Sequence, residues 1–451
     1  MTTDPMQPVP MYGPEFAGDP HTVYAKLRAY GACAPVELAP GVRATLVTSY
    51  RAALEVLHDT DTYSKDPRVW QHTLPADSQL LPMLMWRANA LFNDGEVHAR
   101  YRRATTDSLA LIEPHELRDL VHRSADSLIS GFADRGEVDL ISEYVRVLPL
   151  LIFSGVFGVS EAASPRLVAA AHGMFDAHSP EEAHQANDEF GHLLAELVAA
   201  KREKPGPDFT SWLIDHPVEL SEEEVIGQLV TTLAAGYDPL TNLMGNALAR
   251  MLSDPRYYRT VSSGALTVTD AITDVLWNDP PVANYSAHYP RRDVDLHGTW
   301  IPAGTPVLVS YAAANTAPAD LPPGPRSDSG AHLAFAAGPH ACPAQQPAVL
   351  IATTAIDRLT SWLCDIRLTV PFDQLTWRPG PFHRALTELP AVFTPIAPDQ
   401  KGTSPWTVSR SSSTPPEETS PAKQPVSGRQ DRPSVSYSPA TSKRGPSPAT
   451  P

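Results

Sequence analysis

The sequence predicts a single large domain that is mainly α-helical and carries small β-sheets, an α+β fold. Apolar residues recur at helical spacing in many segments, and the longest of these, 222–252, is apolar on nearly every face, as in a helix inside a protein. Short strand patterns with glycine turns stand at 36–48 and 294–310. The length of 451 residues is sufficient for a sizeable core.

The individual elements can be justified in order along the chain. The stretch "VELAPGVRATLVT" (36–48) predicts a hairpin with Pro40 and Gly41 at its turn, and "VDLHGTWIPAGTPVLVS" (294–310) predicts further short strands. Ser221 and Glu224 have the spacing of a capping box, which marks the start of the longest helix. We expect helices at 50–58, 96–111, 114–133, 138–158, 187–202, 222–252, 268–277 and 345–364.

The two ends of the chain differ from its body in composition. We expect residues 1–14 to be a flexible N-terminus and residues 15–395 to form the domain. Residues 396–451 are rich in proline and serine and poor in aliphatic residues. Such a segment cannot bury enough apolar surface to offset its ordering entropy, so we expect a disordered tail.

Composition also argues against several classes of function. The formal net charge of −16 disfavours nucleic-acid binding and attachment to anionic membranes. The most apolar stretch, 147–159, is too short to span a bilayer, so we expect a buried helix there and no membrane insertion. The N-terminus has no signal-peptide pattern, and the three cysteines are too widely spaced to suggest a disulfide framework. These features predict a cytoplasmic protein.

Cys342 stands in a loop whose composition favours a thiolate. The stretch "AFAAGPHACPAQQPAVL" (334–350) places it just before a predicted helix, where backbone N–H groups and the helix dipole stabilise negative charge. Gly338 allows the backbone to approach a flat ligand closely. No second cysteine or histidine lies at zinc-finger spacing. One protein thiolate on an otherwise open metal is a pattern of haem proteins.

Phe335, Gly338, His340 and Cys342 match the haem-binding signature of the cytochromes P450. The chain resembles this family over residues 15–395. The stretches "DPHTVYAKLRAYG", "NDGEVHARYRRAT" and "PFDQLTWRPGPFHRALTELPAVF" are similar, in that order, to the first helix, the C helix and the C-terminal strands of actinobacterial members. The resemblance implies the cytochrome P450 fold, with haem b (iron protoporphyrin IX) as the cofactor.

The resemblance also implies roles for individual residues. Cys342 is expected to bind the haem iron, and Phe335 and Gly338 to contact the haem. Asp238, in "AAGYDPLTN" (234–242), matches the family's proton-relaying acid; the alternative is an ordinary solvated or capped carboxylate. His288 stands where many relatives carry arginine, and its participation is left open. The residues expected to bind the haem propionates are His98, Arg102, His332 and His340.

Two departures from the family pattern lie on helices. Pro239 occupies the position of the family's threonine, and because proline cannot donate to the carbonyl of Ala235, we expect a distorted helix without the hydroxyl. The family's Glu-x-x-Arg motif reads Asp274-Val-Leu-Trp277. Asp274 therefore needs another cation, for which Arg326 is the candidate, or it is more solvated than the family's glutamate.

A third departure follows the cysteine directly, where the sequence reads Pro343-Ala344. Proline has no N–H, so one hydrogen bond to the sulfur is missing and we expect a more electron-rich thiolate.

The resemblance implies a monooxygenase that inserts one oxygen atom of O2 into a small or medium apolar organic substrate. The electrons would come from a separate ferredoxin or flavodoxin-type donor, since no flavin or iron–sulfur motif is present. The three departures keep a second interpretation open. It is a haem-binding protein of the same fold whose activity is lost, peroxide-using or non-oxygenating, and which serves in sensing or partner binding.

Overall fold

The computed structural model describes residues 7–396, except for 76, 77, 79, 161, 177–179, 255, 257–265, 318–329 and 364. All described residues belong to one compact unit, Met1–Trp406. Helices dominate this unit and the described strands form small sheets, which confirms the predicted fold class. The predicted tail at 396–451 lies outside the described residues apart from its first residue.

The α-helices are α1 (Pro14–Gly18), α2 (Pro20–Leu27), α3 (Tyr50–His58), α4 (Leu81–Leu84), α5 (Gly95–Leu109), α6 (Pro114–Phe132), α7 (Leu148–Val156), α8 (Ser164–Asp176), α9 (Pro180–Glu203), α10 (Phe209–Ile214), α11 (Glu222–Ser253), α12 (Val268–Asn278), α13 (Tyr311–Asn315) and α14 (Gln345–Trp362). Short 3-10 turns are η1 (Arg28–Tyr30), η2 (Pro67–Val69), η3 (Gln71–Thr73), η8 (Gly338–His340) and η9 (Phe372–Gln374), and η4 (Ile141–Val145) is a π-helix.

The strands are β1 (Val9–Pro10), β2 (Cys33–Ala39), β3 (Val42–Val47), β4 (Tyr63–Ser64), β5 (Glu137–Asp139), β6 (Asn284–Pro290), β7 (Val294–Leu296), β8 (Thr299–Ile301), β9 (Val307–Ser310), β10 (Arg367–Leu368) and β11 (Pro390–Val392). The largest sheet has the strand order β1-β2-β3-β9-β6-β4. Sequence alone did not predict β1, β4 or β6.

The predicted hairpin is present as the antiparallel pair β2–β3, and Gly41 takes a φ of +81° at its turn. Part of the N-terminal segment expected to be flexible is ordered by this hairpin. β1 pairs in parallel with β2, the backbone N–H of Met11 donates to the Glu37 carbonyl, and the Met11 side chain is fully buried. The apolar contact of Met11 is the physical reason why order begins before residue 15.

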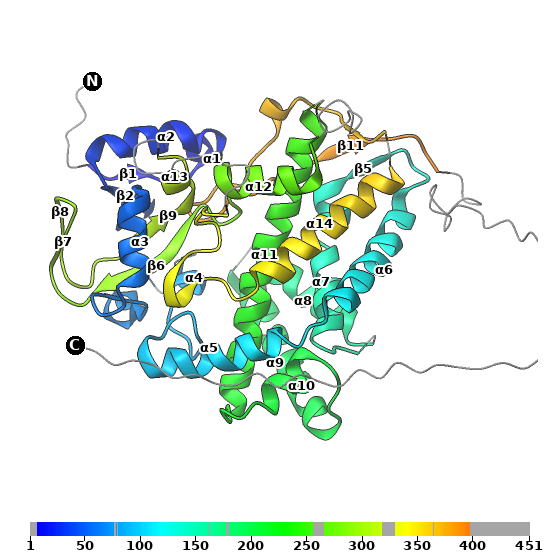
Figure 1. The fold of residues 1–451 in the computed structure, drawn as a ribbon, viewed down its shortest axis with the longest axis horizontal. Coiled ribbons are helices and arrows are strands. Elements are labelled where there is room, and N and C mark those ends of the chain that lie inside the picture. Colours follow the sequence, from blue (N-terminus) through cyan, green and yellow to red (C-terminus); the bar gives the residue numbers. More distant parts are fainter. Residues whose placement is uncertain are drawn as a thin grey trace, which may run out of the picture. The chain divides into compact units, whose positions relative to one another are not determined.

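The helical part of the unit is built around α11, which crosses behind α14 and runs between α14 and the strand-rich region in Figure 1. Its start at Ser221 is a complete capping box with Glu224, as predicted. The helix continues without interruption through Pro239, so the expected distortion does not appear as a break.

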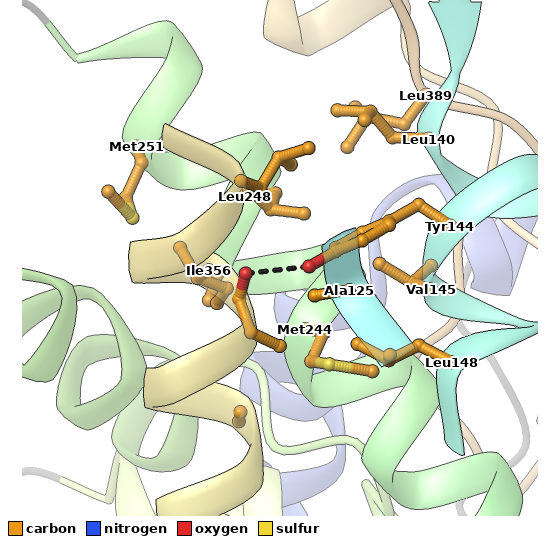
Figure 2. Packing of buried hydrophobic residues seen from close by; sticks show 14 of the residues in the cluster. Ala125, Leu140, Tyr144, Val145, Leu148, Met244, Leu248, Met251, Ile356 and Leu389 are labelled. Atoms are coloured by element: carbon orange, nitrogen blue, oxygen red, sulfur yellow. Dashed lines mark hydrogen bonds between the residues drawn. The ribbon is translucent and has the colours of Figure 1, made fainter. Parts of the chain in front are cut away.

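One apolar cluster joins α6, α7, α11, α12 and α14. Figure 2 shows Tyr144 of the π-helix inside this cluster, where its hydroxyl donates to the Ala355 carbonyl of α14 at 2.7 Å. This bond satisfies a buried polar atom and ties the π-helix to α14. The helix expected at 138–158 is divided: β5 ends at Asp139, the π-helix η4 follows, and most of the apolar stretch 147–159 forms the predicted buried helix, α7. Within the described part of the chain, no helix has both the length and the apolar character needed to cross a membrane.

Candidate active site

The loop that carries Cys342 is closed by its own backbone. The N–H of Cys342 donates to the Phe335 carbonyl at 2.8 Å, and the N–H of Ala341 donates to the Gly338 carbonyl at 3.1 Å. Gly338 has a φ of +69°, and a Cβ atom there would lie 2.3 Å from the Leu57 carbonyl oxygen of α3. Only glycine fits this position, both because of its left-handed backbone and because the α3 backbone is so close.

The Cys342 side chain is solvent-accessible although much protein surrounds it. Burial raises the pKa of its thiol, while a hydrogen bond from the backbone N–H of Ala344 and the charge of Arg102 lower it. The Ala344 donor belongs to the start of α14, where the sequence analysis expected backbone support for a thiolate. The other expected donor position, Pro343, has no N–H.

His98 and Arg102 both lie on α5, one turn apart, as the i, i+4 spacing requires. The rings of His98 and His340 are in contact, with centroids 4.0 Å apart and planes inclined by 37°. Arg102 donates through Nη2 to the Ala341 carbonyl, next to Cys342. The structure therefore brings these three predicted residues together at the cysteine loop.

His332 lies at the opposite end of the loop segment, beside Phe335, with ring centroids 5.9 Å apart. The Trp277 ring meets it edge to face at 5.9 Å. Within the part of the chain that the structure describes, three histidine ring nitrogens are buried without a hydrogen-bond partner: His98 Nε2, His332 Nδ1 and His340 Nε2. Buried polar atoms of this kind normally have a partner, so each nitrogen indicates a polar group that binds there.

Two residues of this region were missed by the sequence analysis, Lys65 and Asp94. Asp94 accepts hydrogen bonds from the Ser64 hydroxyl at 2.6 Å and the Lys65 backbone N–H at 3.0 Å, and pairs with Arg291 at 3.0 Å. It lies 3.6 Å from His340 Nε2, which is an ion-pair distance but too long for a hydrogen bond. Burial alone would raise the pKa of Asp94, but these hydrogen bonds and the charge of His340 lower it to about 2.

Asp238 is buried in the middle of α11 and is not an ordinary solvated carboxylate. Its Oδ2 accepts from Arg378 Nη2 at 2.7 Å and from Asn242 Nδ2 at 3.2 Å, and His383 Nδ1 lies 3.4 Å away. Burial alone would raise the pKa of Asp238, but the charges of His383 and Arg378 hold it below its ordinary value. A pocket of about 210 Å³ borders Asp238, Thr241 and Arg378.

The chain can now be compared with known proteins. No model of a protein family matches it. It is 30% identical over 388 residues to the cytochrome P450 monooxygenase PikC of Streptomyces venezuelae, in an alignment that covers 84% of this chain and 92% of that protein. The chain belongs to the cytochrome P450 family.

Other similarities agree with this P450 assignment. The 2-hydroxy-5-methyl-1-naphthoate 7-hydroxylase of Streptomyces carzinostaticus is 30% identical over 374 residues, covering 79% of this chain and 91% of that enzyme. The structure of CYP154A1 from Streptomyces coelicolor superposes with a TM-score of 0.71 at 28% identity, covering 83% of this chain and 98% of CYP154A1. This P450 is therefore a monooxygenase of the actinobacterial type, and its cofactor is a haem held by a cysteine thiolate.

The residues of this P450 fit a haem. The three unpartnered histidine nitrogens are suited to propionate oxygens, the Cys342 thiol is accessible, and the glycine turn at Gly338 keeps the loop close to α3. The two haem propionates need nitrogen donors such as these histidines when they are buried, because burying an unpaired carboxylate is strongly unfavourable.

Asp274 and Trp277, which match the position of the family's Glu-x-x-Arg motif in the sequence, lie on α12. Asp274 accepts a hydrogen bond from Asn278 at 2.8 Å, lies 3.6 Å from Arg250 Nε, and has a side chain that is 42% exposed. Asp274 is thus partly solvated and also has a cation at ion-pair distance, which is Arg250. Arg326, its expected partner, lies outside the described residues.

Asp279, one residue beyond α12, carries the buried ion pairs instead. It accepts from His21 Nε2 at 2.9 Å, from Arg250 Nη2, and lies 3.6 Å from Arg384 Nε. Burial alone would raise the pKa of Asp279, but its hydrogen bond with His21 and the charges of His21 and the two arginines lower it to about 2. The sequence offered no signal for this cluster, because its members are far apart along the chain.

Proposed function

We propose that Cys342 is the axial thiolate ligand of the haem iron and that His98, Arg102, His332 and His340 bind the haem propionates, with Phe335 and Gly338 in contact with the haem. The three buried ring nitrogens without a partner, on His98, His332 and His340, are the observation that carries this proposal. Arg102 contributes a fixed positive charge beside the thiol and holds the loop through the Ala341 carbonyl.

When bound, the haem supplies the iron at which O2 is reduced and one oxygen atom is passed to a C–H bond of the substrate. We propose that Asp238 relays protons to this reaction through its Oδ2 atom. The lowered pKa of Asp238 supports a carboxylate that is ionised at neutral pH. Its contacts with Arg378 and His383 connect it to residues outside α11, from which protons would reach it. Pro239 offers no hydroxyl, so Asp238, water and the substrate itself are the proton carriers that remain.

We propose that the substrate is a small or medium, mainly apolar organic molecule, hydroxylated with electrons from a ferredoxin or flavodoxin-type donor. Relatives such as the vitamin D(3) 25-hydroxylase of Pseudonocardia autotrophica, 28% identical over 404 residues, support this class of substrate. A cytoplasmic location is part of the proposal and is supported by the free thiols of Cys33 and Cys342. We also propose residues 15–395 as the haem domain and Asp274-to-Trp277 as an altered K-helix motif.

The absorption spectrum of the reduced, carbon monoxide-bound protein tests the iron ligand. We expect the strongly red-shifted Soret band of thiolate ligation in the purified protein and its loss in Cys342→Ala. A Soret band without that shift in the unaltered protein, or one that survives in Cys342→Ala, would overturn the proposal.

Product analysis with NADH and a ferredoxin system tests the role of Asp238. Removing a positioned proton-transfer group lowers rates by about 100-fold or more. We therefore expect Asp238→Asn to keep the thiolate spectrum and to consume NADH with little hydroxylated product. Unchanged product formation in this variant would show that Asp238 is not the relay.

A further inference from the structure

Lys65 is a buried lysine. It follows β4 directly, and only 2% of its surface is exposed. Its ammonium donates to the Ser286 hydroxyl at 3.1 Å and to the Ala287 carbonyl at 2.9 Å, both on β6. An ammonium has three N–H groups, so these two neutral acceptors leave one N–H group of Lys65 without an acceptor.

In the described part of the chain, the Lys65 ammonium lacks a direct ion pair, although the charge of Asp94 acts on it and opposes the lowering of its pKa. Among the residues that the structure describes, no carboxylate oxygen lies within 4 Å of Lys65 Nζ. Asp94 is the nearest candidate, but its carboxylate accepts from Ser64 and from the backbone N–H of Lys65, and it pairs with Arg291. A buried charge is rare unless it is paired, because removal from water is costly. Burial accordingly lowers the pKa of Lys65 to about 7.

The surroundings of Lys65 are basic rather than acidic. Its charge acts on His98, His288 and His340, and each of these pKa values is lowered by burial first and by Lys65 as a further cause. His98 and His340 are the pair of rings in contact, and their Nε2 atoms have no hydrogen-bond partner among the described residues. Lys65 and this pair thus place buried nitrogen atoms that lack a partner or an acceptor in one region, and such groups are suited to the oxygen atoms of an anionic ligand.

His288, whose role the sequence left open, is not the suitable cation here. It is buried, and its Nδ1 contacts the Ser286 carbonyl at the irregularity in β6. Lys65, directly after β4, donates to Ser286 and Ala287 at the same bulge and keeps a third N–H group for a ligand.

We infer that Lys65 binds a haem propionate, as a further member of the set formed by His98, Arg102, His332 and His340. The inference rests on the proposed haem site. Lys65 is a positioning residue in this role, since it holds the haem periphery and does not touch the reacting atoms.

The test uses the haem-loaded full chain and its variants Lys65→Met and Lys65→Gln. Methionine removes the charge at similar length, and glutamine keeps a donor for Ser286 or Ala287 if the methionine variant does not fold. Lys65→Arg is the rescue variant, and Lys26→Met, at an exposed position of α2, is the control. The measurements are the rate of haem transfer to excess apomyoglobin and the propionate bending band in the resonance Raman spectrum.

Loss of one charge-assisted hydrogen bond predicts haem transfer about 10-fold faster in Lys65→Met and Lys65→Gln. We expect a shifted propionate band in both, near-normal behaviour in Lys65→Arg, and no change in Lys26→Met. Two results would overturn the inference: an unchanged rate of haem transfer, or faster transfer with an unshifted propionate band. The second result is what a purely structural contact between Lys65 and β6 would produce. Failure of the Cys342 spectrum in the unaltered chain would instead contradict the proposed haem site.

Discussion

The rings of His98 and His340 lie in contact, with centroids 4.0 Å apart, although the two residues come from α5 and from the cysteine loop. Each ring has a buried Nε2 without a partner among the described residues. Two such groups in contact cannot act independently on a shared ligand, because moving one ring moves the other.

We therefore predict that His98→Gln and His340→Gln each accelerate haem loss by about 10-fold. The double variant should lose haem at a rate that departs from the product of the two single effects. Haem transfer to apomyoglobin measures all three rates, and His115→Gln, at an exposed position at the start of α6, serves as the control. Independent, multiplicative effects would contradict a shared ligand.

Gly338 permits a second prediction with a closely matched control. Alanine at 338 incurs the strain of a positive φ and a Cβ contact of 2.3 Å with the Leu57 carbonyl oxygen. Gly298 has a similar φ of +85° with nothing within 4 Å of its Cβ position. Gly298→Ala should therefore lower the free energy of unfolding by only about 1–2 kcal/mol.

Gly338→Ala should lower stability further than Gly298→Ala and should also reduce the haem content, since α3 and the cysteine loop must separate. Thermal melting and the ratio of Soret to protein absorbance measure the two effects. Equal losses in the two variants would mean that the contact with Leu57 is easily relieved.

The successes of the sequence analysis share a physical cause. α3 was predicted at its observed bounds, and the Ser221–Glu224 capping box was identified, because both depend on residues a few positions apart. The cysteine loop was likewise recognisable, since its glycine, histidine and cysteine stand together in the chain. Local spacing was sufficient for these features.

The omissions have the opposite character. Lys65 donates a hydrogen bond to Ser286 of β6, 221 positions away in the sequence, and Arg378 donates one to Asp238, 140 positions away. Nothing in the local sequence distinguishes a buried lysine from an exposed one, because burial is decided by strands that pair at long range. Strand β4 has two residues, too few for any periodic pattern.

The contact between Arg378 and Asp238 predicts a change in pH dependence. The charges of His383 and Arg378 lower the pKa of Asp238, so Arg378→Gln should raise that pKa. If the ionised carboxylate is the relaying form, the acidic limb of the kcat/KM profile should then move to higher pH. Arg367→Gln, at an exposed position on β10, should leave the profile unchanged. Coincident profiles for all three proteins would contradict this prediction.

Asp279 predicts an effect on stability. Replacing it with asparagine leaves Arg250 and the buried Arg384 without their shared carboxylate, which should cost about 3–5 kcal/mol of unfolding free energy. The pKa of Asp279 is about 2 in the folded protein and about 3.9 in an unfolded chain. Its contribution is therefore complete above pH 4 and is lost as the pH falls from about 3.9 towards 2.

Denaturant unfolding at pH 7 and at pH 3 measures both consequences for Asp279→Asn. The difference in stability from the unaltered protein should be smaller at pH 3 than at pH 7. Asp119→Asn, at an exposed position of α6, should be neutral at both values. A stability difference that does not change with pH would assign the effect to packing rather than to charge.

Pro343, the residue after the proposed ligand Cys342, predicts a change in reduction potential. Ala344 supplies one N–H to the Cys342 sulfur, and Pro343 cannot supply a second. Leucine at 343 adds an N–H beside the sulfur, which would withdraw electron density and stabilise the reduced iron. A net hydrogen-bond energy of about 0.5–1.5 kcal/mol corresponds to about 20–60 mV for one electron, so Pro343→Leu should raise the potential by that amount. Spectroelectrochemical titration measures it, with Pro371→Leu as a distant control that also gains an N–H. Equal potentials in all three proteins would mean that Pro343 does not tune the thiolate.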